Sequence, residues 1–141
     1  MGDNVSLPSR LLILNNLKKD SRDVVKLNMI SILNTQSSLG IDKYLEIAER
    51  DGLDTRYFGM PSLHEISFES EIDKAKLCKA VKFAIDSFEP RLNDVKINFV
   101  NYDKNLKTVK LNVEGFYKAS DDDMNIQVIL RLTLWEYIIY E

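Results

Sequence analysis

The residues that could carry catalytic or metal chemistry are few and poorly grouped. His64 is the only histidine and Cys78 the only cysteine among 141 residues. Neither a histidine cluster nor a cysteine-rich metal site can therefore form within this chain. No serine or cysteine lies near His64 at a spacing known for nucleophilic catalysis. We predict that His64 is a surface or loop residue and that Cys78 lies in the core or at its boundary.

The acidic residues allow two chemical interpretations. The run Asp121, Asp122 and Asp123 suggests calcium, but the spaced ligands and the distal glutamate of an EF-hand are missing. A solvated hairpin turn explains this run better. A glycosidase would need two carboxylates at a set separation, and the sequence singles out no pair in an apolar setting among its 22 acidic residues. We therefore expect no enzymatic activity and no catalytic, cofactor-binding or metal-binding residues.

The most distinctive polar residues are Glu89 and Arg91, which flank Pro90 in the segment Phe88 to Leu92. Arg91 offers a planar fork of donors that suits the carboxylate of a partner protein. Because Pro90 stiffens the backbone, we predict that Glu89 and Arg91 project from a rigid corner and bind partners. The alternative is that the two side chains pair within the domain and cap the preceding helix.

Size and composition restrict the class of protein. A chain of 141 residues fits one domain, residues 1–141, and its apolar and charged fractions of 45% and 29% are ordinary for a soluble protein. The net charge of -3 has the wrong sign for a nucleic-acid partner. The sequence has no apolar run near the roughly 20 residues of a membrane span and no basic-then-apolar signal at its start. We expect a cytoplasmic protein that does not insert into a membrane.

Helical periodicity dominates the first two thirds of the chain. It predicts an amphipathic helix over about 7–19 and a second helix over about 21–34, whose apolar positions are spread widely enough that protein should surround it. A short helix around Tyr44 to Ala48 should end at Asp51-Gly52, with the glycine in the left-handed conformation. The segment Tyr57 to Pro61 has aromatic anchors and turn residues, so we expect an ordered loop held against the core.

The third helix, over about 70–88, has the clearest boundaries. Ser70 and Asp73 have the spacing of a capping box at its start, and Pro90 stops it. Beyond this helix the apolar period changes to two, which predicts strands at 95–99, 109–113 and 126–134 with turns at 102–105 and 120–125. Gly115 suggests a bulge or bend. The expected fold class is α+β, with N-terminal helices followed by a long helix packed on a three-stranded antiparallel β-meander.

Several short motifs together resemble the lysozyme-like phage baseplate wedge family, which includes the type VI secretion baseplate subunit TssE. The residues Glu89-Pro90-Arg91-Leu92, placed between a helix and an alternating strand, resemble the family's hallmark. Three further segments agree in order with family landmarks: residues 6–11, the stretch Ile32-Leu33-Asn34-Thr35, and residues 57–63. The chain departs from the family where an arginine-rich stretch is replaced by residues 36–40, and in the loop over 41–56.

The resemblance implies a structural role without hydrolysis. Its relatives sit in a baseplate docked on the inner membrane, with the wedge proteins TssF and TssG and near TssK, and are thought to start polymerisation of the contractile sheath. An edge strand of the meander, at 95–99 or 126–134, would then accept a strand from a sheath protein by backbone pairing. A second branch that the chain also resembles consists of regulatory anti-adaptors, which bind a response-regulator partner. The landmarks favour the baseplate interpretation.

Overall fold

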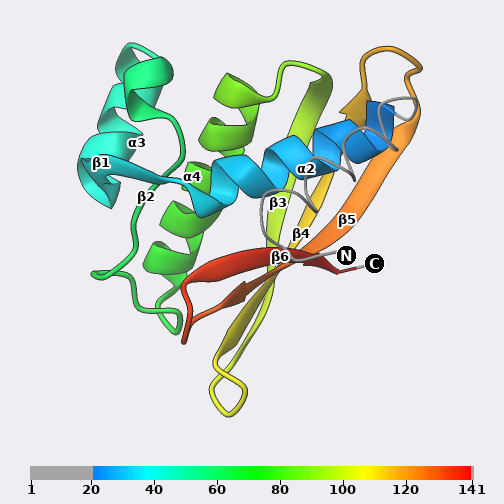
Figure 1. The fold of residues 1–141 in the computed structure, drawn as a ribbon. Helices are drawn as coiled ribbons and strands as arrows, with labels where there is room; N and C mark the ends of the chain where they lie inside the picture. Colours follow the sequence, from blue (N-terminus) through cyan, green and yellow to red (C-terminus); the bar gives the residue numbers. More distant parts are fainter. Residues whose placement is uncertain (1–20, 141) are drawn as a thin grey trace, which may run out of the picture.

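The computed structural model describes residues 21–140, so the helix predicted over about 7–19 lies outside the described residues. The helices are α2 (Ser21–Asn34), α3 (Ile41–Arg50) and α4 (Glu71–Phe88), with a short 3-10 helix η1 (Thr55–Tyr57). The strands are β1 (Gln36–Gly40), β2 (Met60–Ser62), β3 (Leu92–Asp103), β4 (Thr108–Tyr117), β5 (Asp123–Arg131) and β6 (Glu136–Tyr140). Figure 1 shows α2 and α4 beside a twisted antiparallel sheet, with α3 next to α4 and farther from that sheet.

Helix α2 confirms the helix predicted over about 21–34. Its core residues are Val25, Met29, Ile32 and Leu33, each at most 2% exposed. Most of its other described side chains are half-buried, as the broad distribution of apolar positions predicted. The helix packs against both α4 and β6, which places its last turn beside the final strand (Figure 1).

The segment between α2 and α4 is more regular than the sequence indicated. Helix α3 ends as predicted, because the backbone N–H groups of Asp51 and Gly52 both donate to the carbonyl of Ile47 and Gly52 has a φ of +82°. Strands β1 and β2 form a small parallel pair that we did not predict. The residues of β1, Gln36-Ser37-Ser38-Leu39-Gly40, carry no clear apolar alternation, so only the tertiary structure reveals this strand.

The loop before β2 is held against the core as expected. The hydroxyl of Tyr44 donates to the carbonyl of Gly59 at 2.7 Å, and the ring of Phe58 lies 4.9 Å from that of Phe88. Gly59 has a φ of +107°, and a Cβ there would lie 2.2 Å from the carbonyl oxygen of Thr35. A glycine is therefore required both by the backbone conformation and by the close approach of the chain after α2.

Helix α4 begins and ends where the sequence placed it. The Ser70 hydroxyl accepts from the backbone N–H of Asp73 at 3.3 Å, while the Asp73 carboxylate accepts from the N–H of Ser67 at 2.8 Å. The cap is thus a capping box whose return bond reaches three residues before Ser70. The buried face of α4 consists of Leu77, Ala80, Val81, Ala84 and Ile85. This face packs on β3, which confirms a long helix lying on the sheet.

Within residues 21–140, the main sheet has four strands in the order β3-β4-β5-β6, which corrects the predicted three-stranded meander. The predicted strand 126–134 ends at Arg131, and the chain turns back before β6. Alternating apolar residues continue through Leu132 and Leu134, and the turn residue with positive φ is Trp135 rather than glycine or asparagine. No turn signal therefore marks the hairpin in the sequence. The edges of the sheet are β3 and β6, so β5 cannot accept a partner strand.

A bulge disrupts the start of β3. Its pairing with β4 shifts between Asn93 and Lys96, and Asp94 has a φ of 53°. Gly115 lies opposite on β4, where a Cβ would come within 3.0 Å of the carbonyl oxygen of Asn93. The glycine signal thus did mark a bulge, although the extra residue belongs to the neighbouring strand. The apolar faces of β4 and β5 are fully buried beneath the helices.

Candidate partner-binding sites

The first candidate site is the junction between α4 and β3. The backbone N–H of Glu89 donates to the carbonyl of Ile85 at 2.8 Å, which closes the last turn of the helix. Pro90 and Arg91 then turn the chain into β3. Glu89 is only 1% exposed. Our prediction that both charged side chains project from this corner is therefore wrong for Glu89.

The Glu89 carboxylate is saturated with donors from its own chain. Arg91 gives it a two-pronged contact, with Nε 3.0 Å from Oε2 and Nη2 2.8 Å from Oε1. The backbone N–H of Arg91 also donates to Oε2 at 2.8 Å. The amide of Asn28 on α2 donates to Oε1 at 2.8 Å and to the Phe88 carbonyl at 3.1 Å. This network joins α2, α4 and the start of β3, which is the internal pairing that the sequence left as an alternative.

These contacts explain the ionisation of the pair. Burial by itself would raise the pKa of Glu89, but the hydrogen bonds from Arg91 and Asn28 outweigh it and leave that pKa below its ordinary value of 4.5. The hydrogen bond to Glu89 in turn raises the pKa of Arg91. Both side chains are charged at neutral pH. The four donors stabilise the buried Glu89 carboxylate, whereas an unpaired charge at this position would destabilise the folded protein.

Arg91 differs from Glu89 in that 45% of its side chain is exposed. Its Nε and Nη2 atoms hold Glu89, while nearly half of the side chain stays exposed. Binding of partners by Glu89 and Arg91 stays a prediction. Of the two side chains, only Arg91 is exposed enough to reach a partner, and Glu89 fixes its orientation. Sequence inspection missed Asn28, because an asparagine 61 positions before Glu89 gives no spacing signal that links the two.

The second candidate site is the outer edge of β3, which includes the predicted strand 95–99. The Lys82 ammonium of α4 donates to the carbonyl of Val95 at 2.9 Å, so this carbonyl faces away from β4. Backbone groups of successive residues in an antiparallel strand point in alternate directions. The N–H and C=O groups of Ile97 and Phe99 therefore face outward too. Lys82 covers the first outward position of the edge.

A groove of about 670 Å³ runs beside this edge, between β3 and the first turns of α4. Its walls include Phe99, Val100 and Tyr102 on the strand and Ala75 and Cys78 on the helix. Val100 is 48% exposed, and the pairing of β3 with β4 shifts again between Phe99 and Asn101. Charged side chains of the helix and of the strand line the groove as well, so its wall is partly polar. An extended segment can reach the outward backbone groups here and place both apolar and polar side chains against this wall.

The candidate chemical residues occupy ordinary positions. His64 is exposed in the loop after β2, with its ring 5.7 Å from that of Trp135, as predicted for a loop residue. Cys78 is half-buried at the groove, and burial raises the pKa of its thiol. The run of three aspartates turns the chain between β4 and β5, with Asp121 at a φ of 59° and Asp122 paired with Arg22.

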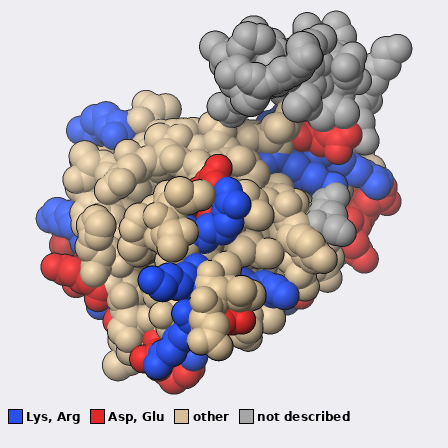
Figure 2. All heavy atoms as spheres, turned by 60° about the horizontal axis from the view of Figure 1, so that its bottom comes forward, with Lys and Arg blue, Asp and Glu red and all other residues tan. Residues whose placement is uncertain are grey.

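Among residues 21–140, no three His, Cys, Asp or Glu side chains are placed to hold a metal ion. In the same part of the chain, no helix is long and apolar enough to cross a membrane. On the face shown in Figure 2, basic and acidic side chains are intermingled. That face offers no continuous basic surface of the kind that phosphate backbones require.

The fold and the two sites define a small α+β subunit with an open sheet edge and an oriented surface arginine. Residues 19–122 match the family model described as baseplate wedge protein gp25, and the match runs from α2 through β4. The chain belongs to this baseplate wedge family and is a structural component of a contractile-type baseplate. Strands β5 and β6 lie beyond the matched range. The comparison with curated proteins finds no match.

Proposed function

We propose that this chain is a TssE-like wedge subunit of a type VI secretion system or a closely related contractile machine, and that it helps to start sheath polymerisation. Membership of the baseplate wedge family supports this role. The observation that carries the more specific proposal is the outer edge of β3, whose outward backbone groups lie beside a groove lined by both apolar and charged side chains. A protein that starts a polymer needs a surface that accepts the first subunit, and an open strand edge is such a surface.

In this proposal, a strand from a sheath protein adds to β3 along Ile97 to Phe99. Backbone hydrogen bonds supply affinity, and alternate side chains of the added strand enter the groove between β3 and α4. The bulge between Phe99 and Asn101 limits the length of regular pairing, which restricts the register that the incoming strand adopts. The groove residues Ala75 and Cys78 then contact the incoming side chains.

In this proposal, the junction between α4 and β3 binds the wedge proteins. We propose that Arg91 contacts a carboxylate of TssF or TssG, with TssK nearby, while Glu89 and Asn28 hold the guanidinium in place. The protein acts at the cytoplasmic face of the inner membrane, where the baseplate is docked. It catalyses no reaction and needs no cofactor, so peptidoglycan incubated with the purified protein should keep its turbidity.

The decisive test compares two substitutions at Ile97. Ile97→Pro removes the outward N–H and the side chain, whereas Ile97→Ala removes most of the side chain and keeps the N–H. Both proteins are checked for folding by circular dichroism and thermal unfolding. We expect sheath assembly, followed by fluorescence of a labelled sheath protein in cells, to persist with Ile97→Ala and to be lost with Ile97→Pro.

Normal sheath assembly with a folded Ile97→Pro protein would refute strand addition at β3. A second measurement tests the class of partner. The purified chain should co-purify with TssF and TssG and should not bind an isolated response-regulator receiver domain. Tight binding to the receiver domain, without wedge binding, would favour the anti-adaptor interpretation instead.

A further inference from the structure

The other edge of the sheet, β6, is closed by one side chain from α2. The amide nitrogen of Asn34 donates to the carbonyl of Tyr137 at 2.9 Å, and the backbone N–H of Tyr137 donates to the Asn34 amide oxygen at 2.7 Å. Two bonds of this kind are what a neighbouring strand would make with Tyr137. Asn34 therefore occupies the position of an absent fifth strand, at the point where α2 ends beside β6 (Figure 1).

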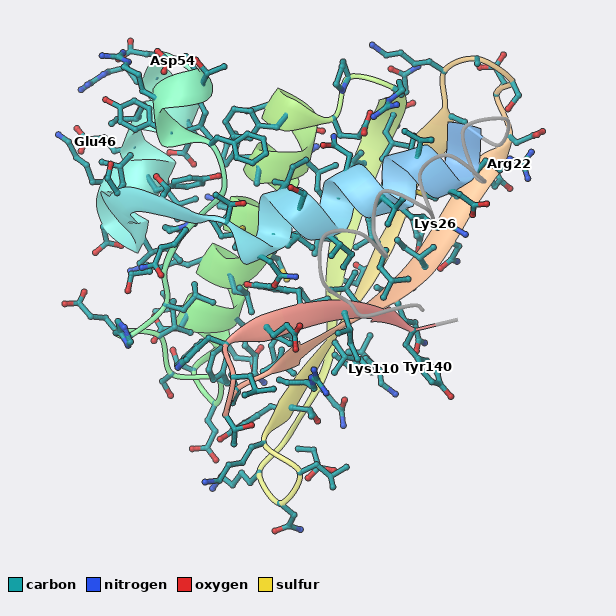
Figure 3. All side chains as sticks on the ribbon, in the orientation of Figure 1. Arg22, Lys26, Glu46, Asp54, Lys110 and Tyr140 are labelled. Atoms are coloured by element: carbon teal, nitrogen blue, oxygen red, sulfur yellow. The ribbon has the colours of Figure 1, made fainter. Side chains whose placement is uncertain are left out.

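The strand that Asn34 covers has a composition suited to pairing. Residues Tyr137-Ile138-Ile139-Tyr140 are all β-branched or aromatic, and Glu136 is the only charge in β6. Tyr140 is 60% exposed and projects away from α2 (Figure 3). Since Tyr137 faces outward, Ile139 faces the same way two residues later. No bond from any described residue covers the outward groups of Ile139.

Other common protections of an edge strand are weak in β6. Its pairing with β5 is regular from Gln127–Tyr140 to Arg131–Glu136, with no bulge, and it contains no lysine or proline. By contrast, β3 carries two register shifts and has Lys82 over Val95. Although β6 is only five residues long, a regular apolar edge without lysine, proline or a bulge is open to pairing with another copy of itself. The clamp on Tyr137 is the clearest barrier that the described residues provide.

We propose that Asn34 is an edge clamp: it blocks pairing of β6 with the β6 strand of a second copy of this chain. It thereby leaves β3 as the edge that accepts a partner strand. The first part concerns the isolated protein alone. The second part rests on the proposed function, because it assumes that strand addition at β3 is productive. Closure of β6 would keep the subunit a monomer until it joins the baseplate.

The test uses the full chain and two substitutions. Asn34→Ala removes the clamp, and Asn34→Ala combined with Ile139→Pro also removes the outward N–H that an added strand would use. Sedimentation velocity gives the mass of each protein, and hydrogen exchange gives the protection of the Tyr137 amide. Asn98→Ala, which removes an exposed amide from the outer face of β3, is the matched control.

We expect the wild type and Asn98→Ala to sediment as monomers. Asn34→Ala should form dimers or larger species, and its Tyr137 amide should exchange about ten-fold faster when the protein is dilute and monomeric. The double variant should return to a monomer. If Asn34→Ala folds poorly, Asn34→Asp is measured in its place. It keeps the acceptor for the Tyr137 N–H but loses the bond to the Tyr137 carbonyl, so it should self-associate more than the wild type.

Three results would overturn the inference. Asn34→Ala could remain a monomer although its Tyr137 amide is deprotected, or the Tyr137 amide could keep its protection. The double variant could also associate as strongly as the single one, which would indicate association through partial unfolding. None of these results depends on sheath assembly. Failure of the clamp is therefore distinguishable from failure of strand addition at β3, which the Ile97 variants test.

Discussion

The junction at Glu89 and the outer edge of β3 are separated by only a few residues, yet they use their polar groups in opposite ways. At the junction, a buried carboxylate receives four hydrogen bonds from its own chain. Along β3, the backbone groups of Ile97 and Phe99 face outward beside a groove. The charged motif is thus largely occupied within the domain, while the alternating strand has outward backbone groups that no residue of 21–140 pairs with.

The difference shows that side-chain chemistry is a poor guide to which groups are available. A buried charge must be paired within the domain, because leaving it unpaired costs several kcal/mol. A strand at the edge of a sheet keeps unpaired backbone groups whatever its side chains are. In the proposed assembly, the junction contributes mainly by fixing Arg91 and the start of β3, and the edge of β3 is the surface that accepts a partner strand.

The largest expected effect is on the junction. Glu89→Ala leaves Arg91 and Asn28 without their shared acceptor, and we expect it to lower the free energy of unfolding by about 2–4 kcal/mol. Urea denaturation measures this change. The control is Asp86→Ala one turn earlier, which removes only a half-exposed ion pair with Lys82 and should cost less than about 1 kcal/mol. Equal losses in the two variants would show that the Glu89 network contributes little.

The acid dependence of stability gives the next largest effect. The pKa of Glu89 is lower in the folded protein than its ordinary value of 4.5, so protonation favours the unfolded chain. The stabilisation is complete at neutral pH and is lost as the pH falls below about 4.5 through the folded-state pKa. Urea titrations between neutral and acid pH should show a shallower loss for Glu89→Gln than for the wild type. Parallel pH curves for the two proteins would contradict this.

A smaller effect separates the two roles of Arg91. Arg91→Lys keeps the charge but cannot reproduce the planar two-pronged contact with Glu89. We expect a loss of stability of roughly 1 kcal/mol, measured by urea denaturation. Co-purification with TssF and TssG should also weaken, because the side chain at position 91 no longer has a fixed orientation. We expect this loss of binding to be larger than the loss of stability. Unchanged wedge binding by this folded variant would remove Arg91 from the proposed interface.

The smallest effect concerns the boundary between the two regions. Lys82→Met keeps the length of the side chain and removes both its bond to the Val95 carbonyl and its ion pair with Asp86. We expect a change in stability of no more than about 1 kcal/mol, with sheath assembly at least as efficient as in the wild type because the open edge is longer. Thermal unfolding and sheath counts in cells measure the two quantities. Impaired sheath assembly would mean that Lys82 itself contacts the partner.

Local signals predicted most elements of this protein. The apolar periods located α2, α4, β4 and the central part of β3, and the sites with special backbone geometry were visible at Gly52 and Gly115. These features follow from short-range physics: the period of a helix or strand, the cap at Ser70, and the conformational freedom of glycine. The family motifs that contain Asn34 and Glu89 were also visible in the sequence, because each motif is a short run of residues and the motifs follow a fixed order.

Only the tertiary structure decided how those motifs are used. Whether Glu89 faces a partner or its own chain depends on Asn28, which lies 61 positions away. Whether Asn34 is a helix end or an edge clamp depends on Tyr137, which lies 103 positions away. The fourth strand was hidden because Trp135 turns the chain without a glycine or asparagine. Burial and strand order are properties of the packed chain. The sequence therefore determined most of the helices and strands, and the fold determined the remaining strands and which groups stay open.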